Sequence, residues 1–257
     1  MISSFGYGIM TTLKIHMSGH SKWATTHRQK ESADAKRSAV FTRLANMITI
    51  AAKESGTDLE SNFKLRLVVD KARAANMPND NIVRAVKRGS GASADGANFE
   101  EIVYEVFGPA NSAFILEGVT DNRNRTVSDL KSVLNKNGGQ LAGPNSVLWL
   151  FDKKGFVEIK KEKLAGNALD DLELSLIDAG AEDIDQAEDW TIKTLPENLQ
   201  KVLDKLKELN IGPSESGLEY VAKSPVKLSP EDRERIHNLF DLLSDLNDIT
   251  NVYTNAE

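Results

Sequence analysis

The sequence of 257 residues contains no cysteine, and aromatic residues make up only 6% of it. The absence of cysteine excludes disulfide bonds and thiolate metal sites, and it fits a protein of the reducing cytoplasm. No apolar run approaches the ~20 residues that a membrane-spanning helix needs, so no membrane partner is expected. What is present, 40% hydrophobic and 27% charged residues, is ordinary for a globular chain.

The net charge of −6 conceals an uneven distribution along the chain. Residues 17–91 contain 14 Lys and Arg against 7 Asp and Glu, whereas residues 92–257 contain 17 against 31. A basic segment on an acidic body suggests that the N-terminal part contacts a polyanion. The alternative is a chance imbalance between two solvated surfaces.

Residues 19–30 form a polar, basic arm in which no apolar period is visible. Its candidate contacts to nucleic acid are His20, Lys22, Trp23, His27 and Arg28. Trp23 could stack on a base, or it could pin the arm onto the helices that follow. The two histidines lack the further ligands that a zinc site needs, so we expect neither a metal nor a cofactor.

From residue 32 to residue 53 the apolar residues follow the spacing of one helix face. Arg37 lies in line with this stripe one turn before it, so the helix start is expected to project beyond the core. Two further helices are expected over residues 62–76 and 80–88. The candidate nucleic-acid contacts on these three helices are Lys36, Arg37, Arg43, Arg66, Lys71, Arg84, Lys87 and Arg88.

A linker at residues 91–98 separates these helices from a region of short strands. Strands are expected over residues 101–107 and 113–119, and a helix over 127–137. A hairpin follows, with strands 146–151 and 156–160 around a turn at 152–155. The remaining pattern predicts a helix over 168–179, a strand near 189–194, a helix over 196–209 and a strand over 218–222. The acidic runs at 170–173 and 182–185 are interpreted as solvated surfaces, and the alternative is that they repel nucleic acid so that one side of the molecule docks.

The last segment, a helix over 230–246 and a strand over 249–253, cannot fold alone. The β-β-α segment 99–139 lacks an α-β unit, so we expect the tail to return and complete it. The prediction is an α+β protein with a three-helix domain (17–90) and two α/β domains with antiparallel, ferredoxin-like sheets. Domain II comprises 99–143 and 224–257, and domain III (144–223) is inserted into it. Residues 1–16 are expected to be a disordered upstream tail, with Met17 as the natural start.

The run at residues 121–126 stands where a strand ends and a helix begins. Backbone N–H groups at such a position attract anions, and Arg123, Asn124 and Arg125 are candidate phosphate contacts there. The alternative is a capped turn whose arginines pair with the acidic domain. No catalytic constellation stands out. A metal-dependent nuclease is the enzymatic alternative, but Asp121 alone lacks the several carboxylates of a two-metal site.

Six ordered runs resemble the signature of the YebC/PmpR family. They are GHSKWA at 19–24, DAKR at 34–37, AAK at 51–53, AANMP at 74–78, AVKRG at 85–89 and DNRNRT at 121–126. The resemblance implies a helical N-terminal domain and two α/β domains, the third inserted into the second.

For function, the resemblance implies a cytoplasmic, non-enzymatic protein, conventionally a DNA-binding transcriptional regulator. Other members of that family are similar in acting on translation, where they associate with the ribosome and help difficult nascent stretches such as proline runs. The expected partner is therefore nucleic acid, either DNA or ribosomal RNA. The absence of a dimerisation helix in the sequence favours a monomer over an obligate dimer.

Overall fold

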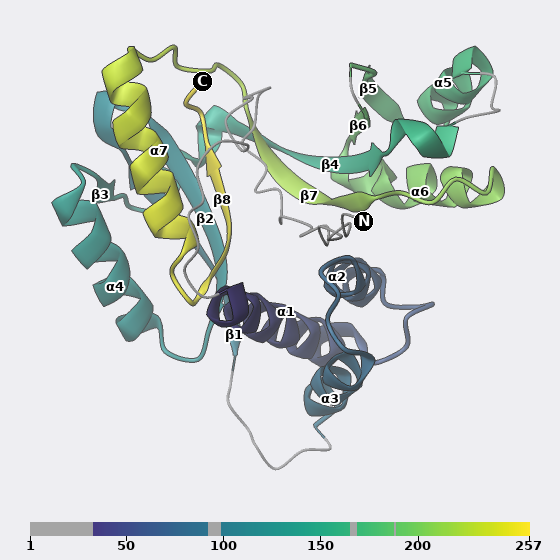
Figure 1. Ribbon diagram of the computed structural model, residues 1–257, viewed down its shortest axis with the longest axis horizontal. Helices are drawn as coiled ribbons and strands as arrows, with labels where there is room; N and C mark the ends of the chain where they lie inside the picture. Colours follow the sequence, from purple (N-terminus) through teal and green to yellow (C-terminus); the bar gives the residue numbers. More distant parts are fainter. Residues whose placement is uncertain (1–32, 92–98, 165–168, 188) are drawn as a thin grey trace, which may run out of the picture.

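The computed structural model describes residues 33–91, 99–164, 169–187 and 189–257, except for the side chains of 33–36. The elements form three lobes around two four-stranded sheets (Figure 1). The fold is α+β with antiparallel sheets and one α/β lobe nested within the other, which confirms the predicted fold class. The predictions for residues 1–16, for the basic arm and for positions 92–98 of the linker lie outside the described residues.

The helical lobe consists of α1 (Ala33–Ser55), α2 (Phe63–Ala74) and α3 (Asn79–Gly89). Its core forms from the apolar stripes that the sequence shows, and it includes Ile48, Leu65 and Ile82. The side chain of Asn62 caps α2 by accepting a hydrogen bond from the N–H of Leu65, at 3.0 Å.

The outer lobe is formed by two segments that are far apart in the sequence, residues 100–141 and residues 230–254. It contains β1 (Glu100–Phe107), β2 (Ala113–Thr120), α4 (Arg123–Lys136), β3 (Gln140–Leu141), α7 (Pro230–Ser244) and β8 (Ile249–Thr254). The sheet order is β3-β1-β2-β8, and α4 and α7 cover one face of it (Figure 1). Leu130, Leu239 and Leu243 fill the core between these helices and the sheet. The C-terminal strand β8 therefore belongs to the same sheet as β1, and the C-terminal helix α7 covers that sheet.

The inserted lobe has the order β-α-β-β-α-β. It contains β4 (Phe151–Ile159), α5 (Leu169–Asp178), β5 (Ala181–Asp185), β6 (Trp190–Thr194), α6 (Leu199–Glu208) and β7 (Glu215–Ala222). The strand order β5-β6-β4-β7 is that of a ferredoxin-like sheet. Leu176 of α5 and Leu206 of α6 pack with Trp190 and Ile192 of β6 in its core.

The predicted hairpin at residues 146–160 is wrong, because β4 runs through the expected turn without a break. Lys153 pairs with Tyr220 of β7, and Gly155 pairs with both Leu218 of β7 and Thr194 of β6. A Cβ at Gly155 would lie 2.9 Å from the Thr194 side chain. This glycine therefore permits close packing in a central strand and does not make a turn.

One strand was not predicted, and one helix begins earlier than expected. The acidic run at 182–185 forms β5, an edge strand in which Ile184 pairs with Ile192 of β6, and Glu182 and Asp183 are exposed, as expected for a solvated surface. The helix expected from residue 127 begins at Arg123, because Asn122 already provides the N-cap. Pairing with β6 determines the strand, and the Asn122 cap determines where the helix starts; local composition specified neither.

A single buried carboxylate fixes the entrance to the inserted lobe. Glu105 of β1 accepts hydrogen bonds from the backbone N–H groups of Asn145, Val147 and Leu148, at 2.5, 2.6 and 2.8 Å. On the return path the N–H of Lys223 donates to the carbonyl of Leu150 at 2.9 Å. The two connections between the lobes are thus held together at the back of the outer sheet.

Candidate nucleic-acid interface

The basic residues proposed as contacts divide by what surrounds them. His20, Lys22, Trp23, His27 and Arg28 lie outside the described residues, and so does the side chain of Lys36, although its backbone belongs to α1. The remaining candidates on the helical lobe fall into a group that binds the other two lobes and a group that faces outward, with Arg88 between the two groups.

Arg43 of α1 joins the helical lobe to the outer lobe. Its Nη1 group donates hydrogen bonds to the carbonyls of Ser244 and Ile249, both at 2.8 Å. The Ser244 carbonyl lies at the end of α7, where backbone acceptors are left without helical partners, and the Ile249 carbonyl lies at the start of β8. Burial lowers the pKa of Arg43, and the nearby carboxylate of Asp245 partly offsets this effect. Arg43 therefore holds two lobes together.

The cationic side of α2 faces the other lobes in a similar way. Arg66 donates to the side-chain oxygen of Gln200 in α6 at 2.6 Å. Lys71 donates to the side chain of Asn251 in β8 at 3.3 Å. Burial lowers the pKa of Lys71, while Glu215 and Glu117 act in the opposite direction. We call Arg43, Arg66 and Lys71 the docked face.

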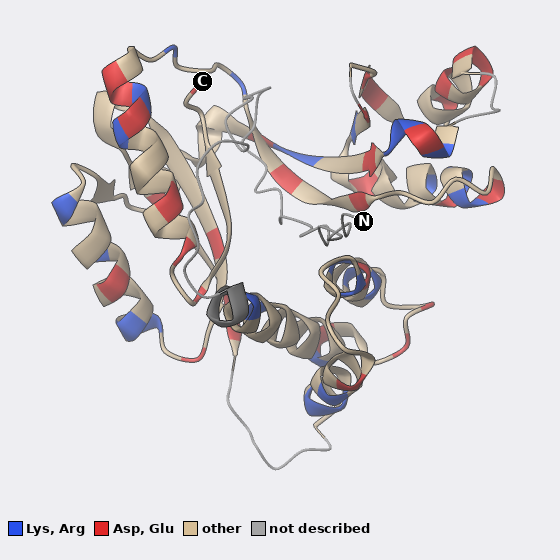
Figure 2. Cartoon of the chain, in the orientation of Figure 1, with Lys and Arg blue, Asp and Glu red and all other residues tan. Residues whose placement is uncertain are grey.

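A second set of cations, which we call the open face, consists of the exposed residues Arg37, Arg84 and Lys87. Arg37 lies near the start of α1. Arg84 and Lys87 lie on α3, and the partners of Arg84 among the described residues are the Asp80 carbonyl and the Asn81 side chain of the same helix. Figure 2 shows the cations of α3 at the end of the molecule remote from the acidic inserted lobe.

Arg88, the last candidate on α3, has an intermediate position. Its Nε group donates to the hydroxyl of Thr49 in α1 at 3.1 Å, and its guanidinium lies 5.7 Å from the centre of the Phe99 ring. Because α1 rises 1.5 Å per residue, Arg37 and Thr49 are separated by roughly 18 Å. Positive charge therefore lies at two separated places beside α1, at Arg37 near its start and at Arg88 of α3, which contacts Thr49.

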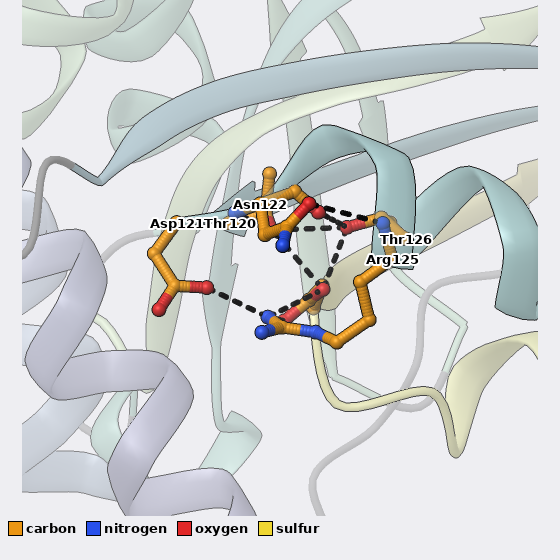
Figure 3. A network of polar contacts seen from close by, with 6 residues as sticks. Thr120, Asp121, Asn122, Arg125 and Thr126 are labelled. Atoms are coloured by element: carbon orange, nitrogen blue, oxygen red, sulfur yellow. Dashed lines mark hydrogen bonds and ion pairs between the residues drawn. The ribbon is translucent and has the colours of Figure 1, made fainter.

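The run at 120–126 forms a network of polar contacts (Figure 3). The side chain of Asn122 accepts a hydrogen bond from the N–H of Arg125 at 3.2 Å. The guanidinium of Arg125 binds Asp121 at 2.7 Å and Asp248 at 3.2 Å, and these hydrogen bonds raise the pKa of Arg125. The hydroxyl of Thr126 also donates to Asp248, at 2.6 Å.

Arg123 is paired as well, with Glu100 at 2.7 Å, and this hydrogen bond raises the pKa of Arg123 and lowers that of Glu100. Asn124 is exposed between the two arginines. The arrangement corresponds to the capped turn with acidic partners. Its carboxylate Asp248 ties the turn between α7 and β8 to the start of α4.

The anchoring partners were not identified from the sequence. Asp248 lies more than 120 positions after Arg125, and the two carbonyls bound by Arg43 lie more than 200 positions after it. No local motif marks such residues, and only the return of the tail to the outer sheet could have indicated them.

Within residues 33–91, 99–164, 169–187 and 189–257, no three His, Cys, Asp or Glu side chains come together where they could bind a metal ion. No helix in these same ranges has both the length and the apolar character to cross a membrane.

Comparison with known proteins gives matches along nearly the whole chain. Residues 21–92 match the model of the TACO1/YebC protein N-terminal domain, and residues 99–256 match that of the TACO1/YebC second and third domain. A "Probable transcriptional regulatory protein" of Thermoanaerobacter pseudethanolicus is 43% identical over 244 residues, covering 94% of this chain and 97% of that protein. One of the same name from Thermotoga maritima is 43% identical over 242 residues, covering 94% of each chain.

A solved structure is similar in fold. The crystal structure of a conserved hypothetical protein, Aq1575 from Aquifex aeolicus, superimposes with a TM-score of 0.78 at 33% sequence identity. The superposition covers 92% of this chain and 97% of that one.

Proposed function

Because the chain belongs to the TACO1/YebC family, we propose that it is a non-enzymatic regulator of gene expression that binds nucleic acid through the open face of its helical lobe. The relatives named as transcriptional regulators support the regulatory role. The observation that carries the proposal is the division of cations. Arg43, Arg66 and Lys71 are bound by the other lobes, while Arg37, Arg84 and Lys87 point to solvent.

The open face suits a phosphate backbone for a simple electrostatic reason. Each cation that neutralises a phosphate releases condensed counterions, which favours binding at low salt. Arg37 and Thr49, where Arg88 of α3 contacts α1, are roughly 18 Å apart, which corresponds to about five base pairs at ~3.4 Å each. We propose that Arg37 and the cations of α3 contact the backbone at separate points, and that the basic arm at residues 19–30 adds further contacts.

The acidic remainder of the chain restricts which side of the molecule can bind nucleic acid. Residues 92–257 carry 31 Asp and Glu against 17 Lys and Arg, and this excess repels phosphate. In the same region Arg123 and Arg125 are neutralised by Glu100, Asp121 and Asp248. Docking on nucleic acid is therefore proposed for the helical lobe alone.

The test is binding of the full chain to duplex DNA, to structured ribosomal RNA and to ribosomes over a range of salt concentrations. Replacing Arg84 and Lys87 by Gln should reduce the slope of log affinity against log salt by about 1.4 to 1.8, because each lost phosphate contact contributes ~0.7–0.9. A matched control replaces Lys131 and Lys136 on α4 by Gln, which removes the same charge from the outer lobe. Equal slopes for the two variants would contradict the assignment of the surface.

The choice of polyanion distinguishes the two forms of regulation. Tighter and steeper binding to DNA supports transcriptional regulation, whereas tighter binding to ribosomal RNA and ribosomes supports action in translation. Chelator-sensitive degradation of the bound nucleic acid would contradict the non-enzymatic proposal.

A further inference from the structure

Helix α5 of the inserted lobe presents an acidic side to solvent that also contains apolar residues. Positions 170, 171, 174, 177 and 178 share one side of a helix. In this chain they are Asp170, Asp171, Leu174, Ile177 and Asp178, and all five are exposed. Leu174 and Ile177 have exposed fractions of 62% and 49%. We call these five residues the acidic face of α5.

The acidic face is additional to the packing of α5 in its own lobe. The opposite side of the helix, with Leu172 and Leu176, is buried in the core. Between Leu164 and Ile192 the sequence contains no Lys or Arg, so no cation of this segment balances the three aspartates. An exposed apolar pair of this kind can form the centre of a small docking surface, with the charged residues as its polar rim.

The complementary surface occurs elsewhere on the same chain. On α3, Val83 has an exposed fraction of 55%, and Lys87 lies one turn further along the same side with Arg84 beside it. Asp80 lies before Val83 on this side of α3, and the two cations lie beside and after it. Val83 with Arg84 and Lys87 thus matches Leu174 and Ile177 with the aspartates of α5. The two helices lie at opposite ends of the molecule (Figure 1), so one chain cannot bring its own two surfaces together in this arrangement.

We propose that the acidic face of α5 docks on α3 of a second copy of the chain. The contact is head-to-tail, because two different surfaces meet, and it leaves one of each free for further copies. The surfaces are small, so the association is weak and depends on protein concentration and salt. A consequence, which rests on the proposed function, is that nucleic acid and a second copy compete for Arg84 and Lys87.

Sedimentation velocity of the full chain over a wide range of concentrations tests the docking without any nucleic acid. The sedimentation coefficient should rise with concentration at low salt and return to the monomer value at high salt. The variant Arg84→Glu/Lys87→Glu and the variant Asp171→Lys/Asp178→Lys should each raise the dissociation constant about tenfold or more, because like charges then face each other. A mixture of these two variants should associate again, because each then supplies the opposite charge to the other.

Two further variants separate specific docking from general charge effects. Leu174→Gln/Ile177→Gln keeps the charge and should also weaken association, since it removes the apolar part of the contact. Glu231→Lys/Glu234→Lys on α7 makes the same charge change as the α5 variant at a distant site and should leave association as in the wild type. The docking is overturned by a chain that stays monomeric at low salt, by association that survives Leu174→Gln/Ile177→Gln, or by an equal effect of the α7 variant.

The competition has its own readout. Duplex DNA or structured RNA added to the associated protein should return it to complexes that contain one copy each. Nucleic acid that binds without dissociating the copies overturns the competition. Self-association without any binding of nucleic acid would instead support the docking and contradict the proposed function.

Discussion

On one side of the helical lobe, Arg43, Arg66 and Lys71 bind groups of the other two lobes, whereas on the other side Arg37, Arg84 and Lys87 face solvent. Both sets come from the same basic segment and have similar side chains. The first set meets backbone carbonyls and amide oxygens that need donors, and two of its members have their pKa lowered by burial. The comparison shows that a count of charges does not identify a binding surface until the internal partners are known.

Deleting residues 230–257 should have the largest effect on this comparison, because it removes the surface on which Arg43 docks. It also removes Leu239, Phe240 and Leu243 from the core of the outer lobe. Each such side chain contributes roughly 1.5–3 kcal/mol by burial, against a total stability of ~5–15 kcal/mol for a domain. The outer lobe should unfold while the inserted lobe persists. Hydrogen exchange resolved by residue measures this, and protection of both lobes in the truncated chain would contradict the nested fold.

Replacing Arg43 by Met should destabilise the protein by about 1.5–3 kcal/mol, because two carbonyls lose a charged donor. The matched change is Arg37→Met on the same helix, which should alter stability by less than ~0.5 kcal/mol because Arg37 is exposed. Chemical denaturation measures both. Equal losses of stability for the two variants would show that the docked and open faces do not differ.

Replacing Lys36 and Arg37 by Glu should flatten the salt dependence of nucleic-acid binding by up to about two units, with weaker binding and an unchanged fold. The physical reason is the loss of two proposed phosphate contacts near the start of α1, of which Arg37 is exposed. Salt-titrated binding of the full chain measures the slope. Unchanged binding would place the contact elsewhere, and tight binding by a fragment of residues 92–257 would exclude the helical lobe as the site.

The smallest effect is expected from the titration of Lys71. Burial lowers its folded pKa below the value of 10.5 that we take for the unfolded chain, so the unfolded chain binds more protons between the two values. Stability conferred at this position should therefore rise with pH through that alkaline window. Lys71→Met should remove this rise, while Lys87→Met on the open face should keep it. Denaturation at a series of alkaline pH values measures the difference, and a fall in the Lys71 contribution with rising pH would contradict the argument.

The sequence predicted most helices and strands, because their apolar residues repeat with the period of the element. It failed at Gly155, where a glycine after two lysines is typical of a turn but lies in a strand paired on both sides. It also failed to identify β5, whose acidic residues occupy an edge strand. Strand pairing is a contact between distant segments, so composition alone leaves it undecided in such cases.

The candidate interface was predicted in part for a related reason. Local pattern assigned positive charge to the helical lobe, but it treated Arg66 and Lys71 as open because their partners Gln200 and Asn251 lie far along the chain. For the turn at Arg125 the sequence left two alternatives, a phosphate site and a capped turn. The ion pair of Arg125 with Asp248 corresponds to the capped turn. The basic arm lies outside the described residues, and its contacts remain a prediction.

The return of the tail to the outer sheet has a consequence for synthesis of the protein. Strand β2, in which Phe114, Ile115 and Leu116 are fully buried, has β8 as its neighbour on one side. A ribosome adds about 5–20 residues per second. The ~130 residues between β2 and β8 therefore take roughly 6 to 26 seconds to synthesise, and until then β2 has no β8 to pair with. During that interval the inserted lobe can fold completely, while an apolar strand edge of the outer lobe remains without its partner. The nascent chain is therefore most prone to aggregation through β2, long after β2 itself has been synthesised.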